Sequence, residues 1–188
     1  MSRVAKAAVG LMAATLVAKI LGFGRELALA SAYGASGVSD AFLVAMNIPA
    51  VIFTAIGTSL GTAFIPLYCE VNANKGEQSS NKFTNNVFNI VVIICIVISV
   101  IGAIFTPQIV KIFAVGFEGE TLRLAIYFTR VMILGLAFLG MSYIMMAYLQ
   151  VKENFIIPGF MSVPYNILII ISIIVSVKIS PYLLPWGT

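Results

Sequence analysis

Residues 87–105 read VFNIVVIICIVISVIGAIF and contain no charged side chain. At 1.5 Å per helical residue this stretch reaches about 28 Å, close to the ~30 Å hydrocarbon core of a bilayer. Similar apolar stretches lie on both sides, separated by turn-forming residues. We therefore predict an all-α, polytopic transmembrane helix bundle with about five spanning helices. The predicted elements are the spans 5–32, 39–71, 82–105, 121–149 and 157–178, and a tail at 179–188.

The composition agrees with this class and excludes several others. Of the 188 residues, 61% are hydrophobic and only 10% are charged, whereas soluble domains carry about 25% charged residues. The chain has no histidine and only seven scattered acidic residues, which leaves little for metal sites, Ser-His-Asp triads or carboxylate-clustered hydrolase centres. We expect no enzyme activity, no metal and no other cofactor.

The charge and cysteine patterns exclude two further classes. The net charge of +4 comes without the dense basic run that nucleic-acid binding requires. Cys95 lies in the middle of an apolar run, so a disulfide with Cys69 is not indicated, and we expect both thiols to be reduced and packed.

The N-terminal segment has two interpretations. Its basic start and apolar run over 7–18 resemble a cleavable signal peptide. However, Lys19, Arg25 and Glu26 interrupt the region that such a peptide keeps uncharged, so we expect the segment to remain as the first span. An odd number of spans without a visible repeat further suggests a piece of a longer transporter, whose other helices would be required.

Basic residues in short loops predict the orientation. Regions 1–6, 72–82 and 152–154 carry lysine or arginine and are expected inside, which places the C-terminus outside. Residues 108–117 mix Lys111 with apolar side chains and suggest a short amphipathic helix at the outer surface. Ser39 and Thr121 are the expected N-caps of the second and fourth spans.

Four charged residues fall inside predicted spans and need an explanation. Lys19, Arg25 and Glu26 lie in the first span and Arg130 in the fourth. A charge at mid-bilayer costs about 2.5–3.5 kcal/mol, so these groups must face protein or water. In one interpretation Lys19 and Glu26, seven residues apart, form a polar seam while both arginines snorkel. In the other, Lys19, Arg25 and Arg130 line a water-filled cavity for an anion such as phosphate.

The second predicted span carries further candidate residues. Asp40 suits the positive end of the helix dipole and could also reach Arg25. Pro49 is expected to kink the helix. Gly57 and Gly61 form a GxxxG spacing that permits close helix approach.

Several of these residues belong to motifs that resemble the MurJ (MviN) lipid II flippases in order and spacing. They are KILGFGRE at 19–26, Gly34, SDAF at 39–42, NIP at 47–49, AFIP at 63–66, FAVGF at 113–117, Arg130, Leu149-Gln150 and FIIPGF at 155–160. The similarity extends to about residue 178. One stretch departs: residues 52–55 read IFTA, where many family members carry one or two arginines.

The resemblance implies a function and a setting. It implies an incomplete lobe of a two-lobed, MATE-like exporter in the bacterial cytoplasmic membrane. Such proteins flip polyprenyl-pyrophosphate-linked peptidoglycan precursor, an anionic lipid, by alternating access during cell-wall synthesis. It also implies that Lys19, Arg25 and Asp40 contact this substrate, while the membrane lipids are the other partners.

Two alternatives remain open. One is a polysaccharide or multidrug exporter of the same superfamily, and the other is a non-transporting structural membrane protein. A cavity lined by Lys19 and Arg25 favours an anionic pyrophosphate over a cationic drug. Charges that face only other helices would favour the structural protein.

Overall fold

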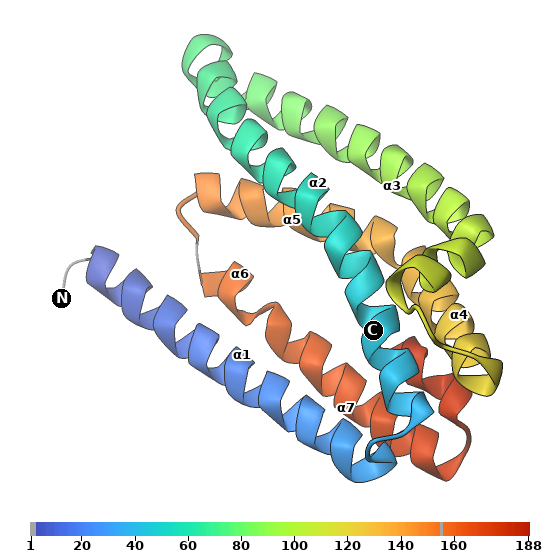
Figure 1. The fold of residues 1–188 in the computed structure, drawn as a ribbon. Helices are drawn as coiled ribbons and strands as arrows, with labels where there is room; N and C mark the ends of the chain where they lie inside the picture. Colours follow the sequence, from blue (N-terminus) through green and yellow to red (C-terminus); the bar gives the residue numbers. More distant parts are fainter. Residues whose placement is uncertain (1–2, 155) are drawn as a thin grey trace.

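The computed structural model describes residues 3–154 and 156–188, with side-chain surroundings for all of these except 3–9, 55, 56 and 156. The described part consists of helices joined by short connections and contains no strand, which confirms the all-α prediction (Figure 1). The elements are α1 (Arg3–Tyr33), α2 (Gly37–Lys75), α3 (Glu77–Phe113), α4 (Gly119–Leu134), α5 (Leu136–Val151), α6 (Ile156–Phe160), α7 (Ser162–Lys178) and the 3-10 helix η1 (Pro181–Gly187).

The helices form two packed groups. Helices α2, α3, α4 and α5 pack against one another as a four-helix group. Helix α1 instead packs along α7 and α6 and contacts α2 only sparsely, whereas η1 folds back onto α7 and α4 (Figure 1). The predicted tail is therefore a folded element that joins the two groups.

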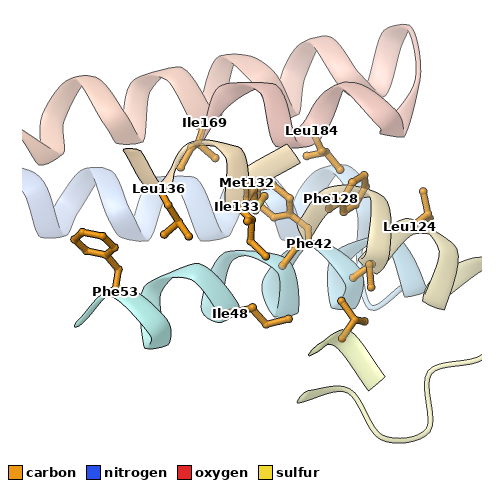
Figure 2. Packing of buried hydrophobic residues seen from close by; sticks show 14 of the residues in the cluster. Phe42, Ile48, Phe53, Leu124, Phe128, Met132, Ile133, Leu136, Ile169 and Leu184 are labelled. Atoms are coloured by element: carbon orange, nitrogen blue, oxygen red, sulfur yellow. The ribbon is translucent and has the colours of Figure 1, made fainter. Parts of the chain in front are cut away.

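A continuous apolar core holds these groups together. Phe42 of α2 and Phe128 of α4 are fully buried and meet edge to face, with ring centroids 6.2 Å apart. Ile169 of α7 and Leu184 of η1 enter the same cluster (Figure 2). Lipid is as apolar as these side chains, so close van der Waals packing is what favours this association within a bilayer.

The outward faces are apolar, and the chain is a membrane protein. In α3, exposed large side chains include Ile93, Ile101 and Ile104. Among the described residues, α2, α3 and 157–178 are each long and apolar enough to cross a membrane. The bent pair α4 and α5, which meet at 42°, would make a fourth span. The predicted span 5–32 begins among residues whose side chains lie outside the described set, and it stays a prediction.

The structure corrects two expectations about helix ends. Residues 108–117 do not form a separate amphipathic helix, because α3 continues through Pro107 to Phe113 and a turn follows. The N-caps are Ser36 and Glu118, not Ser39 and Thr121. Both helices begin earlier than predicted, because the extended backbone that an N-cap adopts lies at Ser36 and Glu118.

Two predicted spans each contain a break in the helix. The span 121–149 is divided at Gly135 into α4 and α5, and the span 157–178 is divided at Met161 into α6 and α7. The break at Met161 follows Pro158 and precedes Pro164, which remove backbone donors on both sides of it. In contrast, α2 stays continuous through Pro49 and Pro66.

Candidate functional site

Arg25 lies on the face of α1 that packs against α7. Ala14 is fully buried farther along this face, where it meets α6: a Cβ added to Gly159 would lie 3.0 Å from the Ala14 Cβ. Gly22 and the buried Leu29 continue the same stripe, and Arg25 falls between them at helical spacings of three and four. The Arg25 side chain is accordingly only 20% exposed.

The charges of α1 are paired differently from the predicted polar seam. Arg25 Nη2 lies 3.7 Å from Glu26 Oε1, whereas the seam would have joined Glu26 to Lys19. Lys19 is exposed, about nine Å along the helix from Arg25. Both cations therefore lie on one apolar helix, but on different faces of it.

Asp40 does not pair with Arg25, which corrects the proposed contact. Among the described side chains, the ion-pair partner of Arg25 is Glu26. Arg25 lies eight residues, about 12 Å, before the end of α1, whereas Asp40 lies three residues, about 5 Å, after the start of α2. The two helices meet only near the connecting turn, so this offset keeps the side chains apart. Asp40 is exposed in the first turn of α2, where its charge favours the helix dipole.

Arg130 is not brought together with the charges of α1. It lies on α4, which makes no contact with α1 in the described part of the chain. Its Nε donates a hydrogen bond to the carbonyl oxygen of Ala103 on α3, at 3.2 Å. This bond links α4 to α3, and the predicted contact of Arg130 with the substrate stays a prediction.

A polar stripe on α2 is the largest feature that sequence reasoning missed. Its members are exposed and lie seven or four residues apart, so they share one face of the helix. The stripe comprises Asp40, Asn47, Thr54, Thr58 and Thr62. The signal that could have found it is the i, i+4, i+8 threonine spacing within an otherwise apolar span.

The threonines of this stripe bond to their own helix. Thr54 Oγ1 donates to the Ala50 carbonyl at 2.6 Å, and Thr58 Oγ1 donates to the Thr54 carbonyl at 2.7 Å. Thr62 Oγ1 lies 3.0 Å from the carbonyl of Thr58. The hydroxyl protons are thereby used within the helix, and the oxygens of Thr54 and Thr62 can also accept hydrogen bonds on the exposed face.

The two glycines predicted to permit close approach differ in their surroundings. A Cβ at Gly57 would lie 2.9 Å from the ring of Tyr143 in α5, so Gly57 does allow this ring onto α2. A Cβ at Gly61 would meet nothing within 4 Å. Gly61 instead borders a groove of about 310 Å³ between α2 and α5. Pro49 is buried inside α2.

Cysteine and acidic side chains supply no further centre in the described part. Cys95 is buried, as expected, but Cys69 is exposed and not packed; both are free thiols. No group of three or more cysteines, aspartates and glutamates among the described residues could hold a metal ion. The absence of a cofactor stays a prediction.

The comparison with known families decides the relationship of this chain. The sequence model described as "Lipid II flippase MurJ" matches residues 29–188. The chain belongs to the MurJ family. The match covers every described element from the end of α1 through η1.

Individual MurJ relatives agree along most of the chain. A probable lipid II flippase MurJ of Buchnera aphidicola subsp. Baizongia pistaciae is 30% identical over 171 residues, which cover 89% of this chain and 33% of the relative. A second, of Aquifex aeolicus, is 30% identical over 85% of this chain and 32% of the relative. The lipid II flippase MurJ of Burkholderia cenocepacia is 27% identical over 92% of this chain and 35% of the relative. The chain therefore spans about a third of the length of the curated relatives that it matches.

Proposed function

We propose that this chain takes part in flipping a polyprenyl-pyrophosphate-linked peptidoglycan precursor, lipid II, across the bacterial cytoplasmic membrane. Its relatives are named lipid II flippases, and their matched region includes most of the described helices. The proposal covers the activity, the anionic lipid substrate and the location in the inner membrane. Catalysis of a covalent step forms no part of it.

The observation that carries this proposal is the state of Arg25. Its guanidinium sits in an apolar helix, largely covered, yet its ion pair with Glu26 is 3.7 Å long, which exceeds hydrogen-bond distance. An arginine at membrane depth needs an anionic partner or water. A guanidinium with donors to spare suits forked contacts with phosphate oxygens. We assign Arg25 the pyrophosphate contact, with exposed Lys19 adding positive charge.

Asp40 and Arg130 take different places in this proposal. Asp40 lies at one end of the polar stripe, where its carboxylate can accept hydrogen bonds from the substrate head group. Because it does not contact Arg25, it acts independently of that residue. Arg130 supports the pairing of α3 and α4, and we do not place it at the pyrophosphate.

Complementation tests this assignment. The complete gene product is expressed in a bacterium depleted of its own lipid II flippase. Growth and the abundance of the expressed protein in the membrane are measured. Arg25→Ala should abolish growth at normal abundance, and Arg25→Lys should restore it only partly, because the forked donor geometry is lost. Asp40→Asn should cause a milder defect. Arg123→Ala, which changes an exposed arginine of α4, is the matched control and should grow normally.

Two outcomes would contradict the proposal. Growth of the Arg25→Ala strain at normal abundance would make Arg25 a structural anchor. Failure of the unaltered protein to support growth, while it is present in the membrane, would argue against lipid II as its substrate.

A further inference from the structure

The groove between α2 and α5 has a lining of unusual chemistry for a membrane helix pair. Its volume is about 310 Å³, and Thr58, Thr62 and Gly61 of α2 face Tyr143, Met146 and Gln150 of α5 across it. The part of the lining that the structure describes contains no charged side chain. An anionic group would find no counter-ion there, so this groove is unlike the surroundings of Arg25.

The α2 side of the groove offers hydrogen-bond acceptors. The hydroxyl proton of Thr62 is directed to backbone carbonyls of Thr58 and Ser59, both 3.0 Å away. That of Thr58 is directed to the Thr54 carbonyl. The Thr62 oxygen can also accept a hydrogen bond, because a hydroxyl oxygen carries two lone pairs.

A proline adds one more acceptor at the same place. Pro66 lies four residues after Thr62 inside α2 and has no N–H, so it cannot donate to the Thr62 carbonyl. Within a membrane, backbone groups released by a proline are satisfied by neighbouring groups or by water. A ligand that carries several donors would suit this carbonyl and the Thr62 hydroxyl oxygen together.

The α5 side supplies an aromatic surface and an amide. The ring of Tyr143 is fixed in place, because it packs 5.4 Å from the ring of Phe53 and lies directly over Gly57. Gln150 brings both a donor and an acceptor. A sugar carries hydroxyl donors, an apolar ring face and no charge. It therefore matches the acceptors, the aromatic ring and the uncharged lining of this groove.

We propose that the α2–α5 groove is a subsite for an uncharged, hydroxyl-bearing sugar of the lipid-linked substrate. This inference rests on the proposed function and adds a second contact region to it. Thr58 lies 21 residues, about 32 Å, along α2 from Gly37, whereas Arg25 lies eight residues, about 12 Å, along α1 from Tyr33, so the two regions lie at different distances from the turn that joins these helices. In this proposal Arg25 contacts the pyrophosphate, and the α2–α5 groove contacts the hydroxyl groups of the sugar.

Equilibrium binding to the purified protein in nanodiscs tests the subsite. The probes are lipid II, undecaprenyl pyrophosphate without sugar, and undecaprenol without either group. The variant Thr62→Val should bind lipid II about fivefold more weakly, because a hydrogen bond is lost, and should bind undecaprenyl pyrophosphate as the unaltered protein does. Thr15→Val is the matched control, since Thr15 is an exposed threonine that bonds back to the Leu11 carbonyl in α1.

A second variant guards against misfolding. Gly61→Val adds bulk to the groove where a Cβ meets nothing within 4 Å, so it should also weaken lipid II binding selectively. Equal effects of these variants on both pyrophosphate probes, or no effect on either, would overturn the subsite. If the unaltered protein binds both pyrophosphate probes no better than undecaprenol, the proposed function itself fails.

Discussion

Arg130 of α4 donates a hydrogen bond through Nε to the carbonyl oxygen of Ala103 on α3, at 3.2 Å. This carbonyl is special because Pro107 occupies the position four residues later and has no N–H to offer it. The hydroxyl of Thr106 approaches the same oxygen at 3.1 Å. The arginine of α4 thus donates a hydrogen bond to a carbonyl oxygen that the proline of α3 leaves without its backbone donor.

This relationship predicts a coupled pair of substitutions. Arg130→Leu should lower the free energy of unfolding by about 1 kcal/mol, since the Ala103 carbonyl loses a donor in an apolar setting. Pro107→Ala restores the backbone N–H, so in its background Arg130→Leu should cost much less. Thermal unfolding of the four proteins in detergent measures the coupling. Additive effects would mean that the arginine stabilises the fold by another route.

The same pair shows what the sequence could and could not predict. The apolar stretches predicted the helices, because length and hydropathy decide which segments can span a bilayer. The role of Arg130 was not predictable, since it depends on α3 lying beside α4. Spacing along one chain contains no information about which carbonyl of another helix lies nearby.

Site prediction had the same limit. The charges of α1 stand out because charge is rare in an apolar helix. Their partners do not: Arg25 pairs with Glu26, its neighbour on α1, and Asp40 stays apart because α1 and α2 make few contacts. The polar stripe of α2 was overlooked because threonine is common in membrane helices and only its exposure in the folded bundle distinguishes it.

The two glycines of α2 predict opposite responses to alanine. Gly57→Ala would place a Cβ 2.9 Å from the Tyr143 ring and should destabilise the protein by about 1–3 kcal/mol through overpacking. Gly61→Ala meets open space and should be neutral or stabilising by up to about 1 kcal/mol, because alanine favours the helix. Melting temperatures of the two variants provide the comparison. Similar losses at both sites would show that Gly61 also lies in a close helix contact.

Topology can be tested by cysteine labelling. The distribution of basic residues predicts that the α2–α3 connection is cytoplasmic and the α3–α4 connection external. Asn74 and Val115 suit single-cysteine probes because both are exposed, Val115 at 88%, whereas the neighbouring Gly76 and Gly119 have positive φ angles that a cysteine would strain.

The background for these probes lacks both native thiols, through Cys69→Ser and Cys95→Ala. On intact cells, an impermeant maleimide should label the cysteine at position 115 and leave that at position 74 unlabelled until the membrane is opened. The reverse pattern would invert the predicted orientation.

An ion pair joins two connections at one end of the bundle. Lys152 Nζ donates to Glu77 Oε1 at 2.6 Å and lies 6.0 Å from the ring centroid of Tyr68 and 5.9 Å from that of Tyr148. The hydrogen bond to Glu77 raises the pKa of Lys152 above its usual value. The end of α5 is thereby held to the beginning of α3.

The sign of this shift predicts how stability depends on pH. A lysine whose pKa is raised on folding contributes stability that is fully present below its unfolded pKa of about 10.4, and loses it only as pH rises through the raised folded value. Lys152→Met should therefore lower the melting temperature by an amount that stays constant between roughly pH 6 and pH 9. Lys82→Met, at another exposed lysine of the same end, is the matched control and should have little effect. A difference between Lys152→Met and the unaltered protein that shrinks across this interval would mean that Lys152 loses its proton near neutral pH, contrary to the pairing with Glu77.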